Sequence, residues 1–82
     1  MDKKITSEQC KSARALLNWS QDDLMVFSGV GKSTIADFER KKRDLLHRTM
    51  NDIVSAFEIH GITFETDEKH LVVRLDFLKN NN

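Results

Sequence analysis

One stretch of the sequence has the residue types of a phosphate-binding loop: Gly29, Val30, Gly31, Lys32, Ser33 and Thr34. Such a loop surrounds phosphate groups with backbone N–H groups and a lysine, and its pattern requires another glycine five residues before the Gly-Lys pair. Val26 occupies that position, and the residues before it have the pattern of a helix rather than of the strand that precedes this loop. We therefore do not predict nucleotide hydrolysis.

A second feature is the basic run Arg40, Lys41, Lys42 and Arg43. The 13 basic and 13 acidic residues give the whole chain a formal net charge of zero. The charges are nevertheless uneven, because residues 32–48 are net basic and residues 49–82 are net acidic. The run is either a solvated connector, as most such runs are, or a local surface for an anionic partner.

Other reactive side chains form no recognisable site. The spacing of His47, His60 and His70 is not that of metal ligands. Cys10 lies on an apolar helix face and is expected in the core, and Trp19 is expected at the edge of the core. We expect a binding protein without metal or cofactor rather than an enzyme.

Four helices are predicted to position these residues within about 60 residues. Thr6 with Gln9, and Ser20 with Asp23, have the spacing of helix starts, and Gly29 suits a helix end. The expected inward-facing residues are Cys10, Ala13, Leu16 and Leu17 in the first helix, Leu24, Phe27 and Ser28 in the second, Ile35 and Phe38 in the third, and Leu46, Met50, Ile53, Val54 and Phe57 in the fourth.

After Gly61 the apolar period changes to two, which predicts a β-hairpin. Its apolar positions are Ile62, Phe64, Leu71, Val73, Leu75 and Phe77. Because an isolated hairpin is barely stable in water, this face must cover the helices or meet another chain. The predicted fold is mainly α, with a domain of four to five helices over residues 1–61, a packing or dimerisation hairpin over 62–78, and a disordered tail over 79–82.

The length of 82 residues allows a single domain, and 39% hydrophobic with 32% charged residues is typical of a small globular protein. No apolar run approaches the roughly 18 residues of a membrane-spanning helix, and the first residues lack the pattern of a signal peptide. A single cysteine forms no internal disulfide. We therefore expect a cytoplasmic protein that does not contact membranes.

Residues 21–40, with the sequence QDDLMVFSGVGKSTIADFER, describe two short helices joined by a glycine-containing turn, which is a helix-turn-helix unit. From Ile5 to Gly61 the chain resembles the Xre, or lambda-repressor-like, family of DNA-binding domains. The resemblance is strongest in the segments ARALLNWSQDDL and SGVGKSTIADFERKKR. It implies a lambda-repressor-like fold that contains a helix-turn-helix.

The resemblance also implies roles for individual residues. The outer face of the third helix would enter the major groove and read bases through Lys32, Ser33, Thr34 and Asp37. Asp37 has a second interpretation, the orientation of Arg40 or Lys41. Backbone phosphates would be bound by Gln21, Arg40, Lys41, Lys42 and Arg43, although the Gln21 amide could instead brace the reading helix or touch a base. Arg14 and Glu39 match positions that form a partly buried ion pair.

These roles define a sequence-specific, double-stranded-DNA-binding transcriptional regulator. We expect a repressor that binds an inverted-repeat operator as a homodimer. The predicted dimer interface uses the apolar face or the edge of the hairpin strand, with Leu71, Val73, Leu75 and Phe77. The alternative is a protein-interaction module, such as an antitoxin or an adaptor, that keeps the same fold but has a protein partner.

Overall fold

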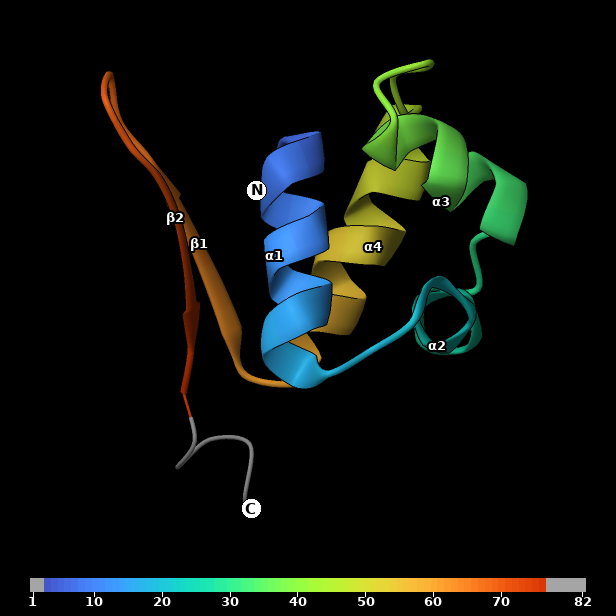
Figure 1. Cartoon of the computed structure of the whole chain (residues 1–82), viewed down its shortest axis with the longest axis horizontal. Helices are drawn as coiled ribbons and strands as arrows, with labels where there is room; N and C mark the ends of the chain where they lie inside the picture. Colours follow the sequence, from blue (N-terminus) through green and yellow to red (C-terminus); the bar gives the residue numbers. More distant parts are fainter. Residues whose placement is uncertain (1–2, 77–82) are drawn as a thin grey trace.

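Four helices followed by one antiparallel β-hairpin make up the computed structural model of this chain, which describes residues 3–76. The elements are α1 (Ser7–Leu17), α2 (Gln21–Ser28), α3 (Lys32–Glu39), α4 (His47–Ile59), β1 (Ile62–Thr66) and β2 (Leu71–Leu75). In Figure 1, α1 lies between the hairpin and α4, whereas α2 and α3 lie on the opposite side of the molecule. The prediction of a mainly α fold with a C-terminal hairpin is confirmed.

The first two helices begin where their capping residues predict. The hydroxyl of Thr6 accepts a hydrogen bond from the backbone N–H of Gln9 at 3.1 Å, and the Gln9 side chain accepts from the Thr6 N–H at 3.0 Å. Ser20 and Asp23 make the same reciprocal pair at 3.0 and 2.9 Å. Each pair satisfies two N–H groups that the first helical turn leaves without partners, which defines the start of α1 and of α2.

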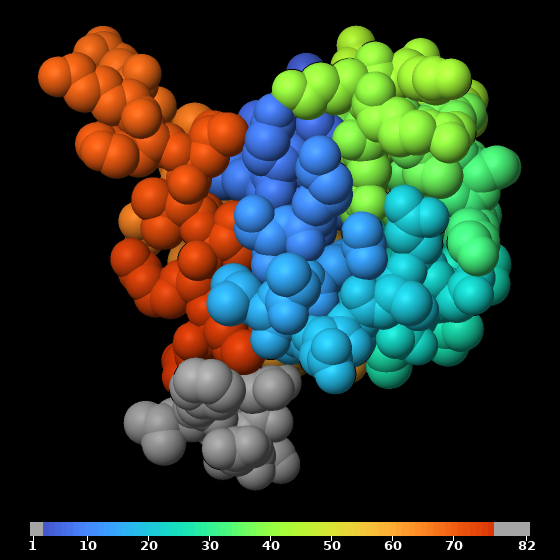
Figure 2. Space-filling model, viewed as in Figure 1, coloured from blue at the N-terminus to red at the C-terminus, as the bar shows by residue number. Residues whose placement is uncertain are grey.

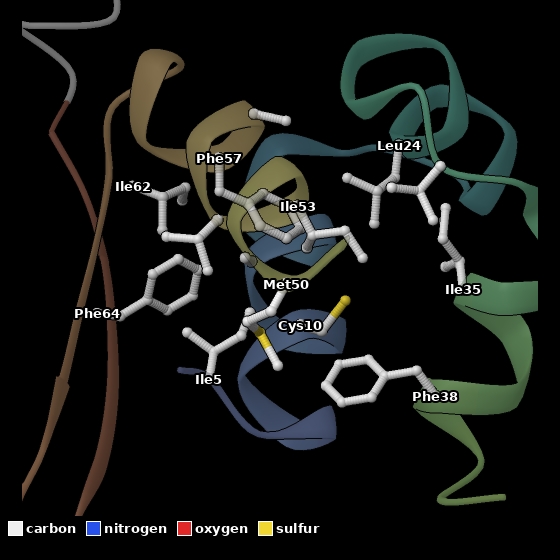
Figure 3. Packing of buried hydrophobic residues seen from close by; sticks show 14 residues of the cluster. Ile5, Cys10, Leu24, Ile35, Phe38, Met50, Ile53, Phe57, Ile62 and Phe64 are labelled. Carbon is white, nitrogen blue, oxygen red and sulfur yellow. The ribbon is translucent and has the colours of Figure 1, made fainter. Parts of the chain in front are cut away.

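A single hydrophobic core joins the helices and the hairpin (Figure 3). Phe57 and Ile53 of α4 lie at its centre, and Ile62 and Phe64 of β1 extend it on the hairpin side. Cys10 and Trp19 occupy the predicted places, with Cys10 fully buried and Trp19 partly buried at the edge. The hairpin is therefore part of the core of the domain rather than an appendage.

Three residues that were expected to face inward are exposed. Leu46 precedes the first turn of α4 as its N-cap, so the buried stripe of that helix begins at Met50. Phe27 is about half exposed and stacks on Trp19 with ring centroids 4.5 Å apart. Leu16 lies at the margin between α1 and β2 and is 46% exposed. Periodicity identifies a helix face but does not show where the neighbouring elements end.

The two strands pair in the register Ile62 with Leu75, Phe64 with Val73, and Thr66 with Leu71. Val73 and Leu75, two residues of the predicted dimer interface, pack against the core of their own chain. Leu71 is 48% exposed. Phe77, the last residue of that set, and the predicted tail lie outside the described residues.

Gln9 attaches the hairpin to α1. Its side chain is buried, and its Nε2 donates to the backbone oxygen of Glu65 at 3.2 Å and to that of Val72 at 3.3 Å. These two residues are cross-strand partners. One amide group therefore bridges both strands, in addition to its role in the capping box of α1.

The turn between α2 and α3 consists of residues 29–31 and contains two glycines in different conformations. Gly29 ends α2 with φ +77°, in the left-handed region that is costly for other residues. Gly31 precedes α3 with φ −61°, which any residue adopts. A Cβ atom on either glycine would meet no atom within 4 Å, so the backbone angle alone distinguishes the two positions.

We predict that Gly29→Ala lowers the free energy of unfolding by about 1–2 kcal/mol because alanine is strained at positive φ. Gly31→Ala is the matched control and should change stability by no more than about 0.5 kcal/mol. Urea unfolding followed by circular dichroism measures both. Equal effects of the two substitutions would contradict the role assigned to the turn.

Candidate nucleic-acid interface

The predicted reading helix, α3, is anchored along one face. Ile35 is fully buried, Phe38 is 6% exposed, and both belong to the hydrophobic core. The helix follows α2 after the three-residue turn and packs against both α2 and α1. Its position is therefore set by two other helices.

Glu39, the last residue of α3, is the centre of a buried polar cluster. Its carboxylate accepts hydrogen bonds from Arg14 Nε at 2.8 Å and from Arg14 Nη2 at 2.7 Å. Gln21 Nε2 donates to it at 3.0 Å, and the Cys10 thiol donates at 3.2 Å. The Glu39 side chain is only 3% exposed and that of Arg14 is 19% exposed. The ion pair that the family resemblance implies is present, with bidentate geometry.

This cluster keeps Glu39 ionised. Burial by itself raises the pKa of a carboxyl group, but the hydrogen bonds from Arg14 and Gln21 outweigh it and hold the pKa of Glu39 below its ordinary value. Burial also raises the pKa of the Cys10 thiol, so the sulfur stays protonated and acts as a donor. Arg14 Nη1 makes a further bond to the backbone oxygen of Trp19 at 3.0 Å. The carboxylate thus connects α1, α2 and α3.

Gln21 takes one of the roles that were open for it. As the first residue of α2, it uses its amide to brace the end of α3 through Glu39. The phosphate contact expected of Gln21 stays a prediction.

Of the four predicted base-reading residues, Ser33 and Asp37 lie on the side of α3 opposite its buried residues, and Lys32 and Thr34 lie at the two margins of that side. Lys32 and Ser33 are exposed, and Thr34 and Asp37 are half-buried. Asp37 binds Arg40 Nη2 at 2.8 Å, which is the orienting role considered for this carboxylate. The face therefore presents a lysine, two hydroxyl groups and an oriented arginine.

The backbone of the basic run has a defined conformation where it follows the end of α3. Lys41 has φ +63°, and the N–H groups of Lys41 and Lys42 donate to the carbonyl oxygens of Phe38 and Asp37. These two bonds form a Schellman motif, in which glycine is the usual residue at the left-handed position. All four basic residues of the run are exposed, and Arg43 Nη1 donates to the Thr34 hydroxyl at 3.3 Å.

Two acidic residues at this surface were not anticipated from the sequence. Asp22 lies 3.1 Å from Lys32 Nζ, and Glu8 forms an ion pair with Lys41. The hydrogen bond from Lys41 lowers the pKa of Glu8 to about 2. Each pair joins different helices or a helix and a loop, so no helical spacing signals it. Only Asp37 and Arg40, three residues apart on one helix, carried a local signal.

Comparison with protein-family models and with curated protein sequences finds no match for this chain. Within residues 3–76, no helix combines the length and the apolar character needed to cross a membrane. In the same part of the chain, no group of three or more His, Cys, Asp and Glu side chains could hold a metal ion.

We predict that Glu39→Gln lowers the free energy of unfolding at pH 7 by about 1.5–3 kcal/mol, because Arg14 loses its charged partner. The pKa of Glu39 is lowered from its ordinary value of 4.5, so its contribution is present above pH 4.5 and is lost as the pH falls further. The difference between wild type and variant should therefore shrink in acid.

Urea unfolding at a series of pH values measures this difference. The matched control is Glu68→Gln, at the exposed turn of the hairpin, which should change stability by less than about 0.5 kcal/mol at pH 7. A Glu39→Gln variant as stable as the control at neutral pH would show that the cluster does not hold the helices together.

Proposed function

We propose that this chain is a sequence-specific, double-stranded-DNA-binding transcriptional regulator of the Xre, or lambda-repressor-like, helix-turn-helix type. It acts as a repressor and binds an inverted-repeat operator as a homodimer. The observation that carries the proposal is that α3 has one buried and one exposed side. Ile35, Phe38 and Glu39 are buried, whereas Lys32 and Ser33 are exposed beside a basic segment. A helix held in this way is suited to insertion in the major groove.

The base sequence of the DNA would be recognised by residues at the start of α3. The Lys32 ammonium group donates to guanine O6 and N7, the Ser33 hydroxyl donates to a purine or a phosphate, and the Thr34 methyl group contacts thymine. Asp37 orients Arg40, with which it is paired. These roles follow the positions of the side chains on the exposed part of the helix.

Affinity would come from Arg40, Lys41, Lys42 and Arg43 at the phosphate backbone. Arg40 and Lys41 already have acidic partners on the same chain, as does Lys32. Exposed ion pairs of this kind are weak, so a phosphate group can replace the Glu8 carboxylate at Lys41, and a base edge can replace that of Asp22 at Lys32. The zero net charge of the whole chain does not exclude binding at this face, because residues 32–48 are net basic and the balancing acidic residues lie mainly in 49–82.

The hairpin does not block the approach of DNA to the exposed face of α3. The hairpin packs on α1 and α4, and Figure 1 shows it on the opposite side of the molecule from α3. No described residue of β1 or β2 therefore separates α3 from a duplex. This arrangement supports DNA binding by the folded chain without a rearrangement of the hairpin.

A protein-interaction module, such as an antitoxin or an adaptor, is the second candidate. It is favoured by the exposed apolar side chains of Val26 and Phe27 on α2 and of Ile59 at the end of α4. Trp19 and His60 pack against Phe27. A surface of this kind is suited to a protein partner. Salt dependence distinguishes the two functions, since only DNA binding requires a strong decrease in affinity with salt.

Selection of bound duplexes from a random pool tests the proposal, and an enriched inverted repeat is the expected result. On the selected site, we predict that Lys32→Ala removes the preference over random DNA, at a cost of about 1–3 kcal/mol. Lys42→Ala should instead weaken all duplexes alike and reduce the slope of log K against log salt by about 1.

Fluorescence anisotropy at several salt concentrations measures both variants. The proposal is contradicted if the wild type binds no duplex at low salt. It is also contradicted if both lysine variants lose site preference to the same extent.

Lys41 provides a separate test because its backbone favours glycine while its side chain would bind phosphate. We predict that Lys41→Gly leaves the free energy of unfolding unchanged or raises it by up to about 1 kcal/mol. DNA affinity should nevertheless fall for every sequence. Thermal unfolding and anisotropy, measured on the same preparation, separate the two effects. A variant that is destabilised and binds DNA normally would contradict this role.

A further inference from the structure

The outer edge of β2 is a row of backbone hydrogen-bonding groups. In the hairpin, the Asp76 N–H donates to the Gly61 oxygen at 2.9 Å and the Asp67 N–H donates to the His70 oxygen at 3.1 Å. Hydrogen-bonded pairs alternate along an antiparallel ladder, so Thr63 with Arg74 and Glu65 with Val72 are the bonded pairs between these ends. In β2, the residues that alternate with these bonded positions are Leu71, Val73 and Leu75. Their backbone N–H and C=O groups point away from β1, toward the outer edge of the sheet.

The side chains along this edge are less covered than those of β1. Ile62 and Phe64 are buried, whereas their cross-strand partners Leu75 and Val73 are half-buried and Leu71 is 48% exposed. A shallow groove runs beside the strand, lined by Ser12, Ala15, Leu16, Leu71 and Val73. Figure 2 shows β2 (red) beside α1 (blue) on the near face of the molecule. An added strand would therefore find both hydrogen-bonding groups and apolar surface.

The sequence of β2 is self-complementary about its middle residue. On the side that faces the helices it reads Leu71, Val73, Leu75, which is the same in either direction. When two copies pair antiparallel with Val73 opposite Val73, Leu71 lies opposite Leu75 of the other copy. Every pair on this side is then aliphatic, and the edge carries no like charges opposite one another.

We propose that the occupant of this edge is β2 of a second copy, which joins the two hairpins into a four-stranded antiparallel sheet. The paired residues exchange backbone hydrogen bonds, and the aliphatic side chains of each added strand cover the groove at Leu16 of the other copy. The sequence left open whether the apolar face or the edge of the hairpin forms the dimer. Val73 and Leu75 already pack on their own core, which leaves the edge. The inference specifies the homodimer of the proposed function, and it is tested without DNA so that either can fail alone.

Disulfide cross-linking tests both the contact and its register. In the proposed dimer, Val72 lies opposite Arg74 of the other copy in a pair without backbone hydrogen bonds, where the Cα atoms are about 4.5 Å apart. That separation lies within the range of a disulfide. Val72→Cys and Arg74→Cys chains, mixed under mild oxidation, should give a cross-linked dimer on a non-reducing gel. Neither variant alone should do so. The native thiol at Cys10 is buried.

Leu71→Lys tests the same edge without oxidation, because a lysine at an exposed strand edge opposes pairing. Sedimentation equilibrium should give a reversible wild-type dimer and at least a tenfold weaker association for this variant. Leu46→Lys is the matched control: the same change at a leucine that is 79% exposed and distant in sequence from β2 should leave association unchanged. Circular dichroism establishes that each variant is folded.

A wild-type chain that stays monomeric at millimolar concentration overturns the inference. So does a mixture of the cysteine variants that cross-links no more than each variant alone. If either result occurs while DNA selection still gives an enriched site, sequence-specific DNA binding stands and the β2 interface does not.

Discussion

The carboxylate of Glu39 is the constraint on which the arrangement of the helices depends. A buried charge is costly unless every oxygen has a partner, and here Arg14, Gln21 and Cys10 supply the partners from α1 and α2. Because the donors come from two other helices, the carboxylate is satisfied in only one relative placement of the three. The position of α3, and with it the exposed face that carries the proposed function, follows from this requirement.

Electrostatics around that face act in two ways. Asp22 and Glu8 are paired with Lys32 and Lys41, so part of the positive charge at this surface is balanced by carboxylates of the same chain. Nearby carboxylates limit the attraction to any polyanion, and in the proposed complex a duplex would have to displace them from Lys32 and Lys41. In the proposed complex, phosphate contacts of the basic run would supply affinity, and base contacts of α3 would supply specificity.

The hairpin completes the core, and within residues 3–76 no third strand pairs with either outer edge of its sheet. Ile62 and Phe64 cover the helices, and Gln9 attaches both strands to α1. This explains why a two-stranded sheet is stable here although such sheets are marginal alone. Since the apolar face serves the domain itself, the proposed association of two copies would use the backbone groups along β2.

Local rules in the sequence determined the element types and most of their ends. Thr6 and Ser20 cap the helices that follow them, and Gly29 takes the left-handed conformation that a helix end requires. The Arg14–Glu39 pair was expected only through resemblance, since its members are 25 residues apart. The acidic partners of Lys32 and Lys41, the bridging amide of Gln9 and the exposure of Leu46 depended on tertiary structure. The physical reason is that capping and periodicity act within a few residues, whereas these contacts and exposures depend on where distant segments pack.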